Sequence, residues 1–329
     1  MMAGPVSGHF ETQTGAACDA DTPSHDSEQT TSDSALTALI DAPFRLVRPL
    51  KQTVPFIFAS PHSGRVYPES FVRQSRLGPV TLRRSEDAFV EDLFAAAAGL
   101  GAACIAAEFP RAYCDVNRAP GELDREMFEG ALSVNVDTPT ARVNAGLGVV
   151  PRIVRDGAEI YRERLPPDEA AKRLSHFYRP YHTQLLRLVE ETRAQFGVAV
   201  VIDCHSMPSA AAVPDIVLGD RYGMAATPAL TRRAERAFER RAFTVGRNVP
   251  YAGGYTTQLY GHPARGVHAL QVEVNRALYL DEERIVRSAR FEDIKRRIGE
   301  VMLELTALEP ALLQPNGGNR SQPGALAAE

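Results

Sequence analysis

The sequence lacks both a long apolar segment and an excess of basic residues. Its longest apolar stretch, residues 94–107, has about 14 residues and two glycines, fewer than the ~20 residues that a membrane-spanning helix needs. The chain begins with neither a basic region nor an apolar core, so we expect no secretory signal. It has 37 Lys and Arg against 41 Asp and Glu, and its net charge of −4 offers no basic surface for a nucleic acid.

Cysteine is also scarce. The four cysteines, Cys18, Cys104, Cys114 and Cys204, include no CxxC pair. In a chain of 329 residues this pattern favours reduced thiols in a cytoplasmic protein over a disulfide framework. We expect Cys204 to be a buried, small apolar residue rather than a nucleophile, because strand alternation directs it away from its neighbour His205.

The two ends of the chain differ from its middle in composition. Residues 1–40 are rich in Ser, Thr, Asp, Gly and Ala and have almost no large apolar side chains. They cannot bury enough surface to offset the entropy lost on ordering, so we expect a disordered tail there and another over residues 313–329. Residues 41–312 between them are predicted to form one α/β domain, without internal repeats.

Apolar runs and helical periodicity alternate along this domain. Strands are predicted at 55–60, 102–109, 198–205, 215–220 and within 268–279. Helices are predicted at 85–99, with Ser85 as N-cap, at 168–196, with a bend at Pro180, and at 228–240 and 281–308. Residues 121–166 read as a long excursion over one face, which in a compact domain is usually functional. The alternation predicts a mixed, mostly parallel sheet flanked by helices.

Polar side chains gather where the predicted strands end. His62 follows the first strand, Asp203 and His205 end the strand at 198–205, and Glu273 lies in the last. In open α/β sheets this edge binds ligands. Two histidines and a carboxylate are a common catalytic zinc site, in which the metal activates water and a separate carboxylate takes the proton. His62 and His205 are candidate ligands, with an acid from residues 85–92 as the third. No HExxH motif is present, so structural histidines remain an equal alternative.

The segment RAYCDVNRAP (111–120) holds a second group of polar residues, which includes Arg111, Asn117 and Arg118. The planar guanidinium of arginine can donate two parallel hydrogen bonds to a carboxylate, which makes Arg118 a candidate substrate clamp beside the Asn117 amide. The alternative is a surface ion pair, which would contribute less than ~1 kcal/mol. This segment alone does not decide between the two.

Six blocks of the sequence together resemble the N-formylglutamate amidohydrolase family. They are SPHSG (60–64), SEDAFVEDLF (85–94), FPRAYCDVNRAP (109–120), DCHSMPS (203–209), DIVLGDRYG (215–223) and GGYTTQLYGHPARGVHALQVEVNRALYLDE (253–282). They occur in the family's order and span roughly residues 45–310. The resemblance implies a fold similar to zinc carboxypeptidases and aspartoacylase. It also implies hydrolysis of N-formyl-L-glutamate to formate and L-glutamate, a step of histidine degradation.

The resemblance also implies roles for individual residues. One zinc ion per chain would be held by His62, Asp87 and His205, with Glu86 as an alternative to Asp87. The general base would be Glu273, and Arg111 would polarise the scissile carbonyl. The substrate carboxylate would be held by Asn117 and Arg118. Asp203 is a candidate to orient a metal ligand.

The Gly-rich stretch YAGGYTTQLYG (251–261) is expected to form a loop beside the pocket. Its Tyr255 and Thr256 hydroxyls are candidates for binding the substrate's side-chain carboxylate, and a turn with solvent-facing hydroxyls is the alternative. The family pattern often has an aspartate where this chain has Ser85.

Two other functions remain open at this point. One is a related zinc amidase or carboxypeptidase that acts on another acyl-amino acid or on a peptide. The other is a binding protein that keeps the fold without catalysis, against which the joint presence of His62, Asp87, His205 and Glu273 argues. The expected partner is a small-molecule acyl-amino-acid substrate.

Overall fold

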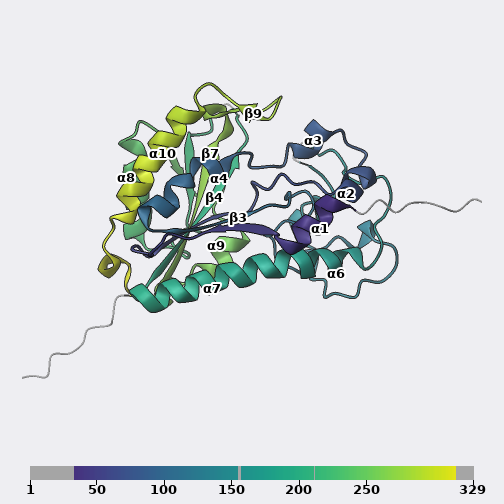
Figure 1. The fold of residues 1–329 in the computed structure, drawn as a ribbon, viewed down its shortest axis with the longest axis horizontal. Coiled ribbons are helices and arrows are strands. Elements are labelled where there is room, and N and C mark those ends of the chain that lie inside the picture. Colours follow the sequence, from purple (N-terminus) through teal and green to yellow (C-terminus); the bar gives the residue numbers. More distant parts are fainter. Residues whose placement is uncertain (1–32, 155–156, 211, 316–329) are drawn as a thin grey trace, which may run out of the picture. The chain divides into compact units, whose positions relative to one another are not determined.

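The strand predicted at 198–205 lies at the centre of the fold. The computed structural model describes residues 33–154, 157–210 and 212–315, and in it this strand is β4, Ala199–Met207, with every residue buried. It lies between β2, Phe56–Ser60, and β7, Val267–Asn275, and is parallel to both. These strands belong to a seven-stranded sheet with the order β1-β3-β2-β4-β7-β5-β6 (Figure 1).

The predicted sheet type is confirmed. β3, Ala103–Ala107, is parallel to β2, and β5, Ile216–Gly219, pairs antiparallel with β7. The two edge strands were not predicted. They are β1, Phe44–Val47, antiparallel to β3, and β6, Val245–Arg247, parallel to β5. Both are short and only partly buried, so neither has the continuous apolar run that marks a central strand.

Helices cover the two faces of the sheet in separate layers. On one face lies α7, Arg179–Phe196, and on the other lie α8, Pro228–Glu239, and α10, Phe291–Thr306 (Figure 1). Alternate residues of β4 pack into the apolar cores on the two faces of the sheet. Val201 packs in the core that contains Leu185 of α7, and Ile202 packs in the core that contains Ile298 of α10. The alternation follows from the two-residue period of a strand.

The helix predicted at 168–196 is present, with an irregular turn inside it. α6, Glu169–Arg173, leads through a π-helical turn, η3, Leu174–Tyr178, into α7. Pro180, where the sequence predicts a bend, stands in the first turn of α7, two residues after this π-helical turn. The bend itself stays a prediction.

Three predicted segments differ from the structure. Residues 85–99 form only α4, Val90–Leu93, and a 3-10 turn, η1, Ala95–Leu100, and Phe89 with φ 63° rather than Ser85 precedes α4. The C-terminal helix begins at Phe291, because a hairpin of β8, Leu280–Asp281, and β9, Val286–Arg287, occupies its predicted start. A short helix, α9, Tyr255–Tyr260, replaces part of the predicted loop.

The described part of the chain reaches into both segments that were predicted to be disordered tails. Ser34–Asp41 form α1, capped by the Asp33 side chain, which accepts a hydrogen bond from the Leu36 N–H at 2.9 Å. Asp33 also accepts from the N–H and hydroxyl of Ser70 in α2, Glu69–Gln74. At the other end, Pro310–Leu313 form η6. Residues 1–32 and 316–329 lie outside the described part of the chain.

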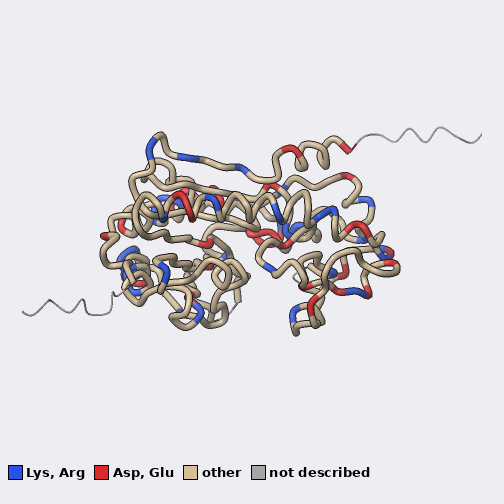
Figure 2. Tube along the Cα trace, turned by 90° about the horizontal axis from the view of Figure 1, so that it is seen from below, with Lys and Arg blue, Asp and Glu red and all other residues tan. Residues whose placement is uncertain are grey.

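The remaining elements are short. They are α3, Pro79–Arg83; η2, Arg125–Met127; α5, Ala141–Asn144; η4, Pro263–Arg265; and η5, Arg276–Leu278. Among the described residues no helix combines the length and apolarity that crossing a bilayer requires. Acidic and basic residues are interspersed along the trace (Figure 2).

Candidate active site

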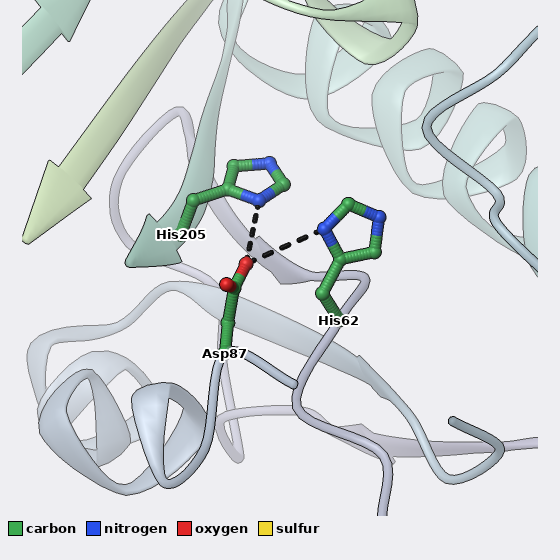
Figure 3. Close-up of side chains that lie close together, drawn as sticks. All are labelled: His62, Asp87 and His205. Atoms are coloured by element: carbon green, nitrogen blue, oxygen red, sulfur yellow. Dashed lines mark hydrogen bonds and ion pairs between the residues drawn. The ribbon is translucent and has the colours of Figure 1, made fainter. Parts of the chain in front are cut away.

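Three buried side chains from distant parts of the sequence converge at the carboxyl edge of the sheet. His62 follows β2, His205 lies near the end of β4, and Asp87 precedes α4 (Figure 3). One ligand atom from each lies within 4.8 Å of the others. Asp87 Oδ2 is 3.3 Å from His62 Nδ1 and 3.0 Å from His205 Nδ1. The structure therefore brings together the three residues proposed as metal ligands.

The outer nitrogens of both rings face carboxylates. His62 Nε2 lies 2.7 Å from Asp115 Oδ1, and His205 Nε2 lies 3.0 Å from Asp203 Oδ2. An outer carboxylate of this kind fixes a metal-binding histidine with its proton on the outer nitrogen. His62 Nδ1 is buried and has no hydrogen-bond partner among the described residues. Two inward imidazole nitrogens and one carboxylate oxygen fit a zinc ion that keeps a position open.

Glu86, the alternative to Asp87, points elsewhere. Its carboxylate accepts hydrogen bonds from Arg83 Nε at 2.9 Å and Nη2 at 3.0 Å, and from the Tyr67 hydroxyl at 2.7 Å. The Asp87 N–H donates to the His62 carbonyl at 3.0 Å, which ties the two segments together beside the cluster. Of the two adjacent acids, only Asp87 faces the histidines.

The charges at this edge of the sheet favour a cation. Burial alone would raise the pKa of Asp87, but its interactions with the neighbouring His205 and His62 hold that pKa well below its usual range. For Asp115, burial is likewise outweighed by the charges of Arg111, His62 and Arg118, so its pKa is also well below the usual range. Both carboxylates therefore stay negative beside the two histidines, where a bound cation would be stabilised.

Glu273 lies beside this cluster. In the sheet it is the register partner of His205, and its side chain lines the same cavity. Gln271 Nε2 donates to Glu273 Oε1 at 2.7 Å, and Gln271 in turn accepts from the Gly254 N–H at 2.8 Å. Burial raises the pKa of Glu273 to about 7, with Asp87 adding to the rise and His205 and Arg111 opposing it. A carboxylate in this range can both accept and return a proton near neutral pH.

The arginines of the RAYCDVNRAP segment both line the cavity. Arg111 Nη2 donates to Asp115 Oδ2 at 2.8 Å. Arg118 donates to the carbonyls of Leu147 and Asn117, each at 2.8 Å, and its side chain is 11% exposed. These contacts make a surface ion pair the wrong description of Arg118, because its guanidinium is held by backbone groups at the cavity wall.

The Asn117 amide also lines the cavity, and its oxygen already has a protein partner. Its Oδ1 accepts from the Thr256 N–H at 2.8 Å, and its Nδ2 lies 3.3 Å from His205 Nε2. A Cβ at Gly254 would lie 2.4 Å from Asn117 Nδ2, so only glycine allows this close approach. Asn117 therefore joins the α9 segment to the histidine cluster.

Tyr255 and Thr256 are not among the residues that line the cavity. The Tyr255 ring packs against His182, with centroids 6.0 Å apart, and Thr256 is buried. Backbone of the preceding residues, Gly253 and Gly254, lines the cavity in their place. The difference arises because these residues form the first turn of α9 instead of the expected loop.

The cavity has a volume of about 530 Å³. Several of its polar residues were given no role from the sequence: Arg84, Arg142, Gln271 and Arg276. Gln271 and Arg276 lie within three residues of Glu273, so the strand-end argument could have included them. Arg142 lies in α5, within the excursion over 121–166, where the sequence offers no periodicity that would point to it.

Cys204 lies on the side of β4 opposite His205, as predicted. It packs with Val200 and Ile202 in the apolar core beneath α8 and α10. Burial raises the pKa of its thiol well above the usual range. A thiol held neutral and facing away from the cavity is not a nucleophile for this site.

Known proteins similar to this chain have a consistent description. The profile of the N-formylglutamate amidohydrolase family matches residues 54–280. N-formylglutamate deformylase of Pseudomonas putida is 29% identical over 242 residues, which cover 70% of this chain and 83% of the relative. The corresponding enzyme of Pseudomonas aeruginosa is 29% identical over 243 residues, covering 70% and 84%.

Solved structures agree with these sequence matches. The crystal structure of N-formylglutamate amidohydrolase from Ralstonia eutropha JMP134 has a TM-score of 0.75 and 34% identity, and the match covers 80% of this chain and 96% of that one. A gene product from Agrobacterium tumefaciens has the same fold, with a TM-score of 0.57 at 18% identity, over 80% and 95% of the two chains.

Proposed function

Because the chain belongs to the N-formylglutamate amidohydrolase family and is a hydrolase of amide bonds, we propose that it converts N-formyl-L-glutamate to formate and L-glutamate. The observation that carries this proposal is the convergence of His62, Asp87 and His205 in one cavity beside Glu273. Within this proposal the reaction serves histidine degradation in the cytoplasm, a setting consistent with the free thiols of Cys104, Cys114 and Cys204.

In this proposal the chain binds one zinc ion through His62 Nδ1, Asp87 Oδ2 and His205 Nδ1. When bound, such an ion polarises the acyl carbonyl and makes water a stronger nucleophile at neutral pH. The carboxylates of Asp115 and Asp203 support the assignment. Asp115 hydrogen-bonds the outer nitrogen of His62, which would keep that ring in the ligand tautomer, and Asp203 lies 3.0 Å from the outer nitrogen of His205.

The proton transfers are assigned to Glu273. It accepts a proton from the attacking water and delivers it to the leaving amine of glutamate as the C–N bond breaks. Its raised pKa, about 7, suits both steps. Gln271 holds Oε1 of this carboxylate and leaves Oε2 to exchange the proton. Arg111, at the cavity wall beside Asp115, stabilises the charge that develops on the formyl oxygen.

Substrate recognition is assigned to the cations of the cavity. N-formylglutamate carries two carboxylates, and Arg118 and Arg142 both line the cavity outside the proposed ligand set. Arg118 is preorganised by its bonds to the Leu147 and Asn117 carbonyls, so little conformational entropy is lost when it binds an anion. The oxygen of the Asn117 amide is bonded to the Thr256 N–H, which fixes this part of the cavity wall.

The proposal is tested by two measurements on the same preparation. Metal analysis should find one zinc per chain, and release of the free amino acid should be fastest with N-formyl-L-glutamate in a panel of N-formyl amino acids, N-acetyl amino acids and peptides. Faster turnover of N-acetyl-aspartate or of a peptide would replace the substrate assignment. Bound zinc with no turnover of any member of the panel would contradict the proposed reaction.

A further inference from the structure

Arg276 is a buried cation for which the proposed chemistry has no use. It begins η5, directly after β7, and is 5% exposed. The Asn275 side chain fixes this turn by accepting a hydrogen bond from the Ala277 N–H at 3.0 Å. Burying a guanidinium is costly unless its donors are all paired, so its partners indicate what it is for.

Both terminal nitrogens of Arg276 donate to the segment around Asp87, and its Nε donates to β4. Nη1 reaches the Arg84 carbonyl at 3.2 Å, and Nη2 reaches both the Glu86 carbonyl at 2.6 Å and Asp87 Oδ1 at 3.0 Å. Nε donates to the Ser206 hydroxyl at 3.0 Å, and that hydroxyl donates to Asp87 Oδ1 at 3.2 Å. The cation therefore joins the end of β7 to the segment that supplies the carboxylate.

These contacts divide the Asp87 carboxylate into two differently engaged oxygens. Oδ1 accepts from Arg276 and Ser206, whereas Oδ2 faces the inward nitrogens of His62 and His205. A carboxylate without such partners can rotate and present both oxygens to a cation. Here rotation would break two hydrogen bonds in a buried site, which costs more than it would in water.

We propose that Arg276 and Ser206 restrict Asp87 to binding the metal through Oδ2 alone. Arg276 is thus a positioning residue that keeps a coordination position free for the substrate, and the inference rests on the proposed metal centre. Lysine could preserve the charge but not the geometry, because an ammonium group lacks the planar fork that spans Asp87 and the two backbone carbonyls.

The test uses full-length protein loaded with Co²⁺, whose visible absorption weakens as its coordination number rises. Arg276→Met should weaken metal affinity by about 10–100-fold, measured by competition with a chelator, and should reduce the Co²⁺ absorption per bound ion. Ser206→Ala should shift the spectrum in the same direction by a smaller amount. Arg276→Lys should recover part of the affinity but not the spectrum.

Arg173→Met is the matched control, since it also removes a buried arginine but one that does not contact Asp87. It should keep the wild-type spectrum and metal affinity at temperatures where it is folded. The inference is overturned if Arg276→Met and Ser206→Ala keep the wild-type spectrum, or if Arg173→Met changes it equally. Wild-type protein that binds neither Zn²⁺ nor Co²⁺ would instead overturn the metal centre itself, and this inference with it.

Discussion

Two buried arginines, Arg173 and Arg276, are surrounded in different ways. The Arg173 guanidinium lies 4.0 Å from the ring centroid of Tyr113 and bonds the Tyr161 hydroxyl and the Glu169 carboxylate. All its partners are interior groups that join α6 to the segments around Tyr113 and Tyr161. Arg276 also has one carboxylate partner, but that partner, Asp87, turns its other oxygen toward two histidines.

The comparison separates a structural use of a buried charge from a functional one. Both arginines need a carboxylate to offset the cost of burial. Glu169 is not among the residues that line the cavity, so we expect the surroundings of Arg173 to contribute to stability. Asp87 lines the cavity, so the surroundings of Arg276 bear on the site. The two arginines therefore differ in whether the carboxylate that each one binds also faces the candidate site.

The largest effect is expected within the cavity itself. Glu273→Gln keeps the shape of the side chain and removes its ability to take a proton, so kcat should fall by ~10²–10⁴-fold. Bound metal and the midpoint of thermal unfolding should change little. The measurement is formate release at saturating N-formylglutamate together with metal analysis. Turnover close to that of the wild type would remove Glu273 from the role of base.

Arg173→Met should have the opposite profile. Removing the cation leaves Glu169 without its buried partner and removes the contact with the Tyr113 ring, so the free energy of unfolding should fall by ~3–5 kcal/mol. Urea denaturation measures this loss. Turnover per folded molecule should match that of the wild type. A stable variant with impaired turnover would show that the two regions are not separable.

A third prediction concerns a carboxylate that lacks a strong partner. Glu91 is buried, and its nearest cation, Arg65, is 3.7 Å away. Burial raises its pKa to about 7, and Asp92 adds to the rise. Between pH ~4.5 and ~7 the folded state keeps a proton that the unfolded state has lost, so this group lowers stability as pH rises.

Glu91→Gln should therefore stabilise the protein above pH ~7 by up to ~3 kcal/mol and should have little effect near pH 4. Chemical denaturation of both proteins across this pH range gives the difference. An equal difference at every pH would mean that packing, and not the ionisation of Glu91, is responsible.

The smallest effect is expected at Cys204, next to a proposed ligand but on the opposite face of β4. Cys204→Ala removes only a buried sulfur, which should cost about 1 kcal/mol of stability. Formate release and metal content should be unchanged. A large loss of turnover would contradict the assignment of this thiol to the apolar core.

Continuous apolar runs made the central strands predictable from sequence, since β2, β3, β4, β5 and β7 all lie where the sequence placed them. Short helices and strands were harder to predict from the sequence. α4 is only four residues long and follows Phe89 in a left-handed conformation, a feature that no periodic pattern encodes. β8 and β9 pair over only two residues each, where the chain turns back before α10, and strands that short show no alternation that the sequence could reveal.

The candidate site was also predictable in part. Residues of the proposed chemistry, such as His62, His205 and Glu273, stood out because polar groups rarely end a buried strand unless they bind something. The choice of Asp87 over Glu86 could not be made from position, because adjacent residues differ only in the direction of their side chains.

The sequence by itself determined the central strands, the ligand-binding edge of the sheet and the types of side chain gathered there, because these depend on local pattern and on the polarity of each residue. Only the tertiary structure decided which oxygen of Asp87 faces the histidines, that Arg276 holds the other one, and that Tyr255 and Thr256 lie away from the cavity. These outcomes depend on the relative directions of side chains from segments far apart in the chain, and such directions are fixed only when the strands and helices pack together.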